Sequence, residues 1–465
     1  MTFQLPDDFL ASQAWQNRID ALAKKYSVPG VQVGVIALDG EGRPDLRVMT
    51  TGVTSLATGI EVTPDTLFQY GSISKVWTTT LIMQLVDEGE LTLETPVVEI
   101  LPAFSIADIA NTKEITVRQL LTHTSGIDGD LFTDTGDNDD YLEKYVDELA
   151  TAISVTPPGG HLSYSNSAFG VAGRIIEVLR GKPWDDVVVE RLLRPLGLTH
   201  VITRTKEAPL FSTAVGHLAN PDTASADKVI PTTRWMLPRS LGPAGNVTGS
   251  MSSLLTFAAA HLRDGLALSD ERILSAESAK LMRTPQFDLT ADSTVDQAWG
   301  LGWVLSDWGT VRSAYHGGAT IGQIARLQTF PELQMAIGVL TNSRGGSGLA
   351  EEIETAIGVE LGFASPKPVA GLPAESCDLT TILGAYESTS NRYELALEED
   401  GRYYLTVIAK EDVNGEPQAP PFPVVPLSNT RFLIEVDGKS HEFTHLVIDG
   451  DPYLFSTRLY KLTSD

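Results

Sequence analysis

Hydrophobic residues recur at helical spacing along much of the first three quarters of the chain. Residues 9–26 carry apolar side chains every three or four positions, and residues 76–88 repeat the pattern, which predicts amphipathic helices. The same pattern predicts further helices at residues 168–179, 187–193, 253–263, 275–283 and 351–361. Shorter apolar runs bounded by turn residues predict strands at residues 31–38, 47–53, 299–304, 324–330 and 335–341. Two early strands, a helical middle and late strands predict an α+β domain.

The pattern changes after a proline-rich stretch. Residues 364–374 contain Pro366, Pro368 and Pro373, and we expect them to link a first domain, residues 1–363, to a second, residues 375–465. In the second domain turn signals such as Asp400-Gly401 separate short strand-like runs. The runs lie at residues 382–388, 393–398, 403–408, 422–425, 432–436, 442–448 and 453–462. This spacing predicts a small antiparallel β-barrel.

Length and charge restrict the possible functions. A chain of 465 residues is too long for one core, which agrees with two domains. The net charge of -26 argues against binding to nucleic acid and to anionic lipid. Cys377 is the single cysteine, so no intrachain disulfide or cysteine-rich metal site can form. The histidines show no metal-ligand spacing, and we expect neither a metal nor a cofactor. The N-terminus lacks the pattern of a secretory signal and no stretch is apolar enough to span a membrane, so we expect a cytoplasmic protein.

Three short motifs carry candidate chemistry. Ser72 and Lys75 are three residues apart at the start of the predicted helix 76–88, which places both side chains on one face. Tyr164-Ser165-Asn166 and His316-Gly317-Gly318 follow later in the chain. A lone Ser-x-x-Lys arises often by chance, but the three motifs in this order are specific. Read separately, Asn166 is also suited to cap a helix, and His123 suits a structural role in its turn.

The ordered motifs resemble those of the serine beta-lactamase-related family, which includes class C beta-lactamases, DD-peptidases and CubicO-type hydrolases. The resemblance covers about residues 10–362 and extends to three connecting segments: residues 120–126, 158–167 and 299–303. It implies a beta-lactamase/transpeptidase-like domain, in which helices flank an antiparallel sheet and a helical subdomain is added. The C-terminal barrel resembles the lipocalin-like domain of some CubicO peptidases and of penicillin-binding-protein-type thioesterases.

The resemblance also assigns roles to residues. Ser72 would be the nucleophile, and Lys75 and Tyr164 would move its proton; which of the two is the base is left open, because both have reference pKa values of about 10. Asn166 would hold Lys75 and the substrate amide. The backbone N–H groups of Ser72 and Ala319 would form the oxyanion hole. We also predict that substrate contacts Gly317, Gly318, Trp235, Trp303 and Arg458, with Arg431 a second barrel arginine able to reach a substrate carboxylate.

His316 stands where classical beta-lactamases carry lysine, so beta-lactamase activity should be poor or absent. The expected function is serine acyl transfer on peptide, ester or thioester substrates, as a peptidase or esterase with a plausible preference for D-residues. One alternative is a thioesterase that releases and cyclises nonribosomal peptides delivered on a carrier protein. A second, from another class, is a catalytically inactive ligand-binding sensor, which would form no covalent adduct at Ser72.

Overall fold

The fold is taken from a computed structural model, which describes residues 4–222, 224–293, 297–363, 371–372, 377–410, 419–436 and 439–463. Apart from residues 371–372, the expected linker at residues 364–374 lies outside these ranges, so both domain boundaries stay predictions. Within the described residues, no helix has the length and apolar character that crossing a bilayer would require.

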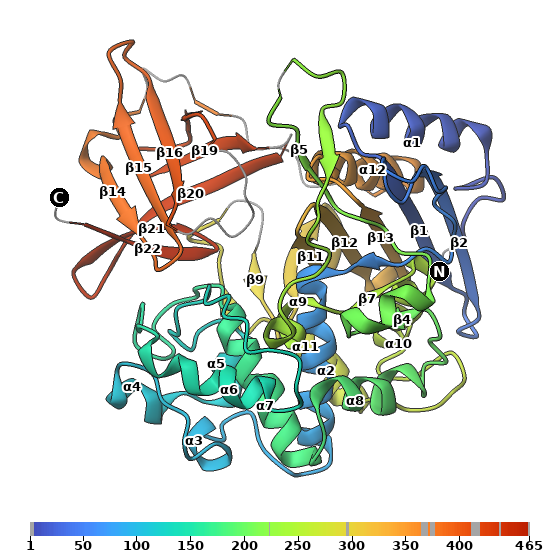
Figure 1. The fold of residues 1–465 in the computed structure, drawn as a ribbon, viewed down its shortest axis with the longest axis horizontal. Coiled ribbons are helices and arrows are strands. Elements are labelled where there is room, and N and C mark those ends of the chain that lie inside the picture. The colour runs from blue at the N-terminus through green and yellow to red at the C-terminus, as the bar shows by residue number, and fades with distance from the viewer. Residues whose placement is uncertain are drawn as a thin grey trace.

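An eight-stranded antiparallel sheet forms the centre of the first part of the chain (Figure 1). Its strand order is β2-β1-β13-β12-β11-β10-β9-β8. In chain order the strands are β1 (Gly30–Leu38), β2 (Pro44–Gly52), β8 (Phe287–Asp288), β9 (Ala298–Trp299), β10 (Val304–Trp308), β11 (Val311–Thr320), β12 (Gln323–Phe330) and β13 (Met335–Thr341). The N-terminal strands thus pair with the last strand, with Val33 opposite Val339. This pairing joins the two ends of the domain in one sheet.

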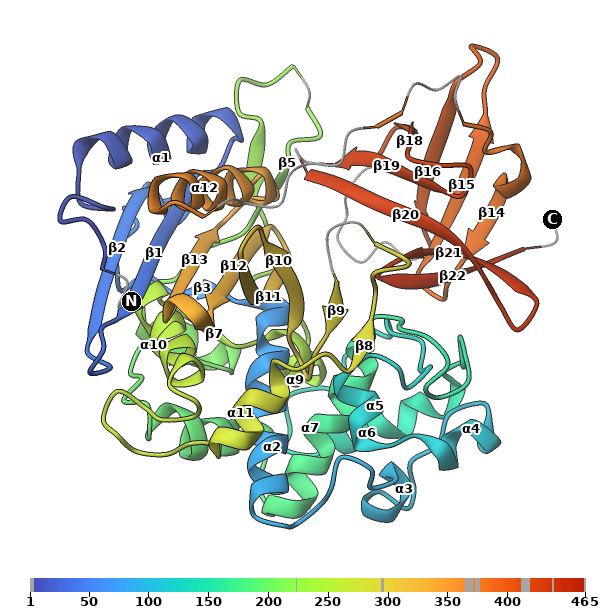
Figure 2. The same ribbon diagram turned by 180° about the vertical axis from the view of Figure 1, so that it is seen from behind.

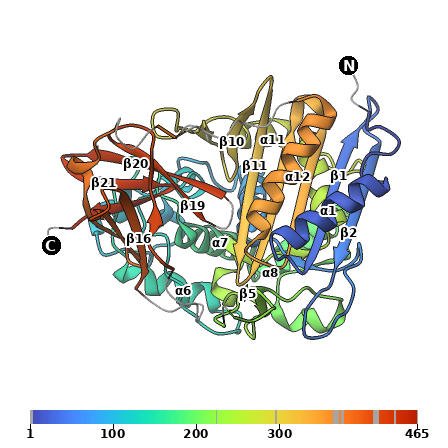
Figure 3. The ribbon, with the colours of Figure 1, turned by 90° about the horizontal axis from the view of Figure 1, so that it is seen from above.

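Helices cover both faces of this sheet, so its central strands are buried on both sides. Helices α1 (Gln13–Lys25) and α12 (Gly346–Leu361) pack side by side on one face, as the view from above shows (Figure 3). Alternate residues of β1 such as Val33 point into that layer, whereas Ile36 points into the larger core on the opposite face. That core includes α2 (Ser74–Asp87) and α10 (Met251–Leu262).

A helical subdomain lies below the sheet in Figure 1. Its helices and those that connect it to the sheet are α3 (Val97–Ile100), α4 (Ile109–Glu114), α5 (Val117–Leu121), α6 (Tyr141–Glu148), α7 (Asn166–Arg180), α8 (Trp184–Val188), α9 (Gly242–Gly245) and α11 (Ala276–Met282). Two small sheets complete this part: β3 (Phe68–Gln69) with β7 (Thr248–Gly249) and β4 (Val201–Ile202), and β5 (His217–Ala219) with β6 (Val229–Pro231). Helices α2, α7 and α9 pack against one another at the border with the sheet.

The C-terminal part is a nearly closed nine-stranded antiparallel barrel, seen from behind in Figure 2. The strand order is β17-β16-β15-β14-β22-β21-β20-β19-β18. The strands are β14 (Gly384–Glu387), β15 (Asn391–Leu397), β16 (Tyr403–Ala409), β17 (Phe422–Pro423), β18 (Val425–Pro426), β19 (Arg431–Val436), β20 (Lys439–Ile448), β21 (Asp451–Ser456) and β22 (Arg458–Leu462). Its core is apolar and includes Tyr386, Leu405, Phe432 and Leu454. The predicted α+β fold with a C-terminal barrel is confirmed.

Two predicted strands are wrong in detail. Residues 299–304 do not form one strand, because Gly302 has φ +71 and breaks the run between β9 and β10. A β-carbon at Gly302 would lie 2.5 Å from Thr79 Oγ1, so this glycine lets the chain approach α2 closely. Residues 453–462 form two strands, since the chain reverses at Thr457 and Ser456 pairs with Arg458.

Candidate active site

Ser72 lies in a 3₁₀ turn, Gly71–Ile73, between β3 and α2. Gly71 begins this turn with φ +53, and a β-carbon there would lie 2.7 Å from the backbone nitrogen of Ala319 on β11. Only glycine tolerates both the backbone angle and the contact. The turn therefore sits directly against β11, and the Ser72 side chain keeps partial access to solvent.

Tyr164 lies just before α7, whose first turn is capped by the Ser165 side chain. Its phenol lies beside the Ser72 hydroxyl, which lowers the pKa of Tyr164. The Tyr164 ring stacks on the buried His123 ring with a centroid distance of 4.3 Å, and His123 Nδ1 accepts a hydrogen bond from the Ser165 N–H. His123 thus fixes the Tyr164 ring. The structure brings Ser72 and Tyr164 together across 92 residues of sequence.

Lys75 is the second residue of α2 and is completely buried. Its Nζ donates to Asn166 Oδ1 at 2.7 Å and to the Ala244 carbonyl at 2.9 Å, and it lies 4.8 Å from the centroid of the Tyr164 ring. Burial lowers the pKa of Lys75 well below its usual value, with a further lowering from the Arg458 charge. Burial raises the pKa of Tyr164, against the opposing effect of the neighbouring Ser72 hydroxyl. Both shifts favour the uncharged amine and phenol.

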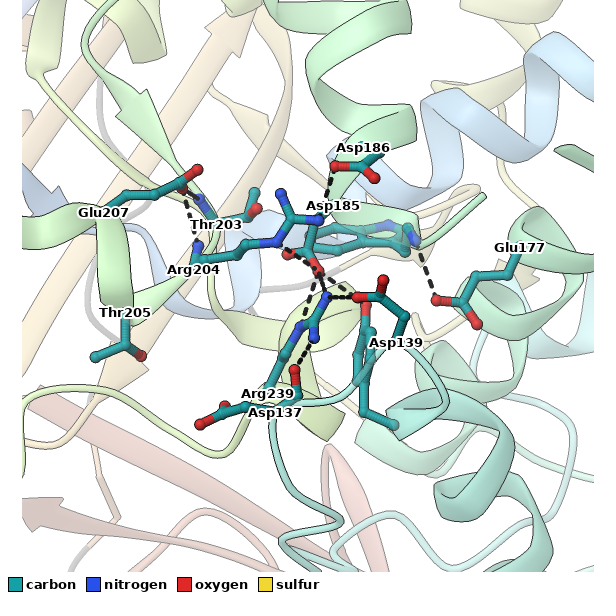
Figure 4. A network of polar contacts seen from close by, with 12 residues as sticks. Asp137, Asp139, Glu177, Asp185, Asp186, Thr203, Arg204, Thr205, Glu207 and Arg239 are labelled. Carbon is teal, nitrogen blue, oxygen red and sulfur yellow. Dashed lines mark hydrogen bonds and ion pairs between the residues drawn. The ribbon is translucent and has the colours of Figure 1, made fainter. Parts of the chain in front are cut away.

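Figure 4 shows a polar network around the buried carboxylate of Asp185, which reaches the segment before α9. Asp185 is completely buried and its Oδ2 accepts from Arg239 Nη2 at 2.9 Å. The same guanidinium donates to Asp139 Oδ1 at 3.1 Å, and Arg204 lies beside Asp185 and Asp186. Since Arg239 opens the turn that runs into α9, the network fixes the segment that presents the Ala244 carbonyl to Lys75.

His316 lies on β11 and is 3 % exposed. Its Nδ1 lies 2.6 Å from the Gly317 carbonyl oxygen, so Nδ1 carries a proton and donates it there. Burial, aided by the nearby Lys75, lowers the pKa of His316 to about 3. The imidazole is therefore neutral around pH 7, and the site lacks the fixed positive charge that lysine would supply at this position.

Strand β11 also brings the two predicted oxyanion donors together. A β-carbon at Gly318 would lie 1.9 Å from the Tyr70 carbonyl oxygen and 3.2 Å from the Ser72 backbone nitrogen. Ala319 follows with its side chain exposed. The backbone amides of residues 72 and 319 thus lie on either side of one close contact. A β-carbon at Gly317 would instead have Arg326 Cδ as its nearest neighbour, at 3.8 Å, so position 317 faces away from Ser72.

The barrel supplies a residue to this site. Arg458 begins β22, and its guanidinium carbon lies 4.7 Å from the centroid of the Tyr164 ring. Both oxygens of Asp130 pair with it at 2.8 Å, and Asp130 Oδ1 also accepts from Asn166 Nδ2 at 2.9 Å. Sequence reasoning missed Asp130. Its one signal, two aspartates flanking Gly129 just after the segment 120–126, does not distinguish a turn from a site.

One predicted substrate contact, Trp303, is wrong, and those of Arg431 and Trp235 are untested. Trp303 is completely buried in the larger core with its edge against His261, so it cannot line a substrate site. Arg431 pairs with Glu442 on the neighbouring strand, within the barrel. Trp235 is partly buried and its Nε1 donates to the Ala214 carbonyl at 2.9 Å; its contact with substrate stays a prediction.

Comparison with known proteins agrees with this geometry. The sequence pattern of the Beta-lactamase family matches residues 15–360. The chain belongs to the Beta-lactamase family. Within it, Penicillin-binding protein 4 of Amycolatopsis lactamdurans is 40% identical over 377 residues, which is 80% of this chain and 97% of that protein. The resemblance stated from the sequence is thereby confirmed.

Some solved structures of similar fold match this member of the Beta-lactamase family over both the first domain and the C-terminal barrel. SurE is 24% identical, with TM-score 0.72 over 97% of this chain and 98% of its own. A structure of SurE with D-Leu is 25% identical, with TM-score 0.68 over 97% and 99%. The D-amino acid amidase of Ochrobactrum anthropi SV3, complexed with L-phenylalanine amide, is 22% identical, with TM-score 0.61 over 74% and 99%.

Proposed function

We propose that the protein is a serine acyl-transfer hydrolase that forms an acyl-enzyme at Ser72 and acts on peptide, ester or thioester carbonyls. The observation that carries this proposal is the Ser72 hydroxyl beside the Tyr164 phenol, with the Lys75 amine buried over the same ring. A serine hydroxyl needs such a neighbouring base to become a nucleophile. Membership of the Beta-lactamase family supports the same chemistry.

In the proposed reaction the Ser72 oxygen attacks the substrate carbonyl while its proton passes to the Tyr164–Lys75 pair. Lys75 starts as the uncharged amine, which burial favours, and ends as the ammonium. The carbonyl oxygen becomes an oxyanion that accepts from the backbone N–H groups of Ser72 and Ala319, and each such donor contributes about 3 kcal/mol. When the tetrahedral intermediate collapses, the bond to the leaving group breaks and the leaving group takes the proton back from the pair.

The acyl-enzyme is then resolved by water or by an amine. Water gives the free acid, whereas an amine gives a new amide; in both cases the pair accepts a proton from the incoming nucleophile and returns it to Ser72. A D-configured residue on the acyl side is supported by the fold shared with SurE, solved with D-Leu, and with a D-amino acid amidase.

A second candidate is a thioesterase that releases and cyclises peptides delivered on a carrier protein. The observation that favours it is the apolar cover over the catalytic tyrosine: Tyr164, Leu162 and Trp299 form one buried cluster with Phe455 and Leu459 of the barrel. Such cover limits water near an acyl-enzyme, which cyclisation requires. The similarity to SurE extends over this barrel as well.

Intact-protein mass spectrometry tests the proposal. The full chain and a Ser72→Ala variant are incubated with a panel of activated esters and thioesters that carry D- or L-residues. We expect an adduct on the wild-type chain, formed faster with D-residues, and none on the variant. Analysis of the released product then separates the free acid from a cyclic amide. Absence of an adduct with every donor would overturn the proposal and favour a ligand-binding sensor.

A further inference from the structure

Two turns of the barrel reach the loop that follows α5. The turn between β14 and β15 binds Asp128, whose Oδ2 accepts from Thr389 Oγ1 at 2.6 Å and from the Thr389 N–H at 3.2 Å. The turn between β21 and β22 carries Arg458, which pairs with Asp130. The barrel therefore contacts this loop through two acidic residues. Of these two, Asp130 also contacts Asn166 in the candidate active site.

The inward path consists of three consecutive polar contacts. Arg458 binds both oxygens of Asp130 at 2.8 Å. Asp130 Oδ1 accepts from Asn166 Nδ2 at 2.9 Å, which directs Asn166 Oδ1 toward Lys75, where it accepts from Nζ at 2.7 Å. The amide of Asn166 can satisfy both neighbours only in this orientation. The Asp130 side chain is 8% exposed and that of Arg458 is 25% exposed, so little water competes for the ion pair.

The turn that presents Arg458 is itself held against the active site. Thr457 has φ +64, which is rare for a β-branched residue. The Thr457 carbonyl accepts from the Tyr164 N–H at 2.8 Å, and the Leu459 N–H donates to Ser163 Oγ at 3.2 Å. A sparsely populated backbone conformation persists where its surroundings stabilise it, often at functional sites. Here the stabilising contacts come from the segment that carries the catalytic tyrosine.

We propose that Asp130 and Arg458 are positioning residues, through which the docked barrel holds Asn166, and thereby Lys75, in the arrangement needed for proton transfer from Ser72. This inference rests on the proposed function. Under this proposal the β21–β22 hairpin contributes Arg458 to the active site. The ion pair also affects the pKa values of Tyr164 and Lys75. While Arg458 and Asp130 are both present, the effects of their opposite charges on these pKa values nearly cancel.

The groups that face Lys75 come from every element around it: Tyr164 before α7, His123 after α5, His316 on β11, Asp130, and Arg458 on β22. Burial lowers the pKa of both histidines, so they stay neutral near pH 7. The remaining charges act in opposite directions: Arg458 lowers the pKa of Lys75 and of Tyr164, and Asp130 raises both. Each charge therefore shifts the pKa of the base in the same direction, whether the base is Lys75 or Tyr164.

Two variants that break the same ion pair should thus shift the pH profile in opposite directions. Arg458→Gln leaves the Asp130 carboxylate alone, raises the pKa of the base, and moves the acid limb of kcat/KM for Ser72 acylation up by about one pH unit. Asp130→Asn keeps an oxygen acceptor for Asn166 but leaves the guanidinium alone, and moves the limb down by a similar amount. The double variant should return close to the wild-type limb.

The assay follows acylation of the full chain by an activated D-residue ester between pH 5 and 9. Lys461→Gln is the matched control, since Lys461 is an exposed cation on the same strand, paired with Asp451, and should not move the limb. If Arg458→Gln does not fold, Arg458→Lys is measured in its place. This variant keeps the positive charge, so its acid limb should stay at the wild-type pH. Shifts in the same direction, or none in folded variants, would overturn the inference. A wild-type chain that forms no adduct would instead overturn the proposed function.

Discussion

Gly318 and Gly317 are neighbours on β11, but a β-carbon at position 318 would be crowded and one at position 317 would not. Replacing each glycine by alanine therefore tests the predicted oxyanion hole. In Gly318→Ala the new β-carbon would lie 1.9 Å from the Tyr70 carbonyl oxygen, so reaching an ordinary 3.4 Å contact requires β11 and the Ser72 turn to separate by about 1.5 Å. In Gly317→Ala the nearest atom would be 3.8 Å away, and nothing needs to move. Neither glycine has a positive φ.

The separation in Gly318→Ala displaces the Ala319 N–H from the Ser72 N–H. Loss of one oxyanion donor costs about 10²- to 10³-fold in rate, and a misplacement of about 1 Å costs a similar factor. We therefore expect Ser72 acylation to slow by about 10²- to 10³-fold. Overpacking should also lower the free energy of unfolding by about 1–3 kcal/mol.

The assay compares acylation rates by intact mass with unfolding in urea for both variants. Gly317→Ala should acylate within about threefold of wild type, because the strand stays in place. If Gly318→Ala acylates at the wild-type rate while folded, or if both variants lose activity equally, the assignment of the Ser72 and Ala319 amides to the oxyanion hole is wrong.

Three further outcomes follow from the site and the core. Tyr164→Phe should slow acylation by about 10²- to 10⁴-fold yet lower the free energy of unfolding by only about 0.5–1.5 kcal/mol, since the ring keeps its stacking on His123; an unchanged rate would remove Tyr164 from the proton path. Benzylpenicillin should acylate Ser72 slowly or not at all, because the neutral His316 offers no charge to its carboxylate, and rapid adduct formation would contradict this. Burial lowers the pKa of His261 to about 3, so protonation of the unfolded chain below pH 6.5 should destabilise the fold. Between pH 7 and 5.5 this costs about 1.3 kcal/mol, so the free energy of unfolding in urea should fall by about that much more in the wild type than in His261→Gln.

The sequence indicates the candidate site residues better than their surroundings, and the reason is physical. Ser72 lies in the 3₁₀ turn that runs directly into α2, three residues before Lys75, so local geometry alone brings them together. The motifs at Tyr164 and His316 are short and ordered. The ion pair between Asp130 and Arg458 joins segments 328 residues apart. Aspartate and arginine are common surface residues, and nothing in the pattern of either segment indicates its partner.

The β21–β22 hairpin was missed for a related reason. Turns are recognised most clearly by Gly, Pro, Asn or Asp, but the reversal at Thr457 has only the weaker signal of Ser456, and apolar residues continue on both sides of it. Trp303 shows the opposite error. A tryptophan beside a family motif suggests a pocket wall, yet in this chain its large apolar ring is packed under α2 and α10, with no surface left for a ligand.

The position of the hairpin late in the chain also affects when the site is completed during translation. The ribosome delivers the nucleophile, its bases and β11 first, and Arg458 emerges 142 residues after His316. At about 5–20 residues per second, roughly 7–28 s separate the two. During that interval the nascent chain holds the candidate site residues without the guanidinium that pairs with Asp130, so under the proposed positioning role the site is complete only after β22 has been translated.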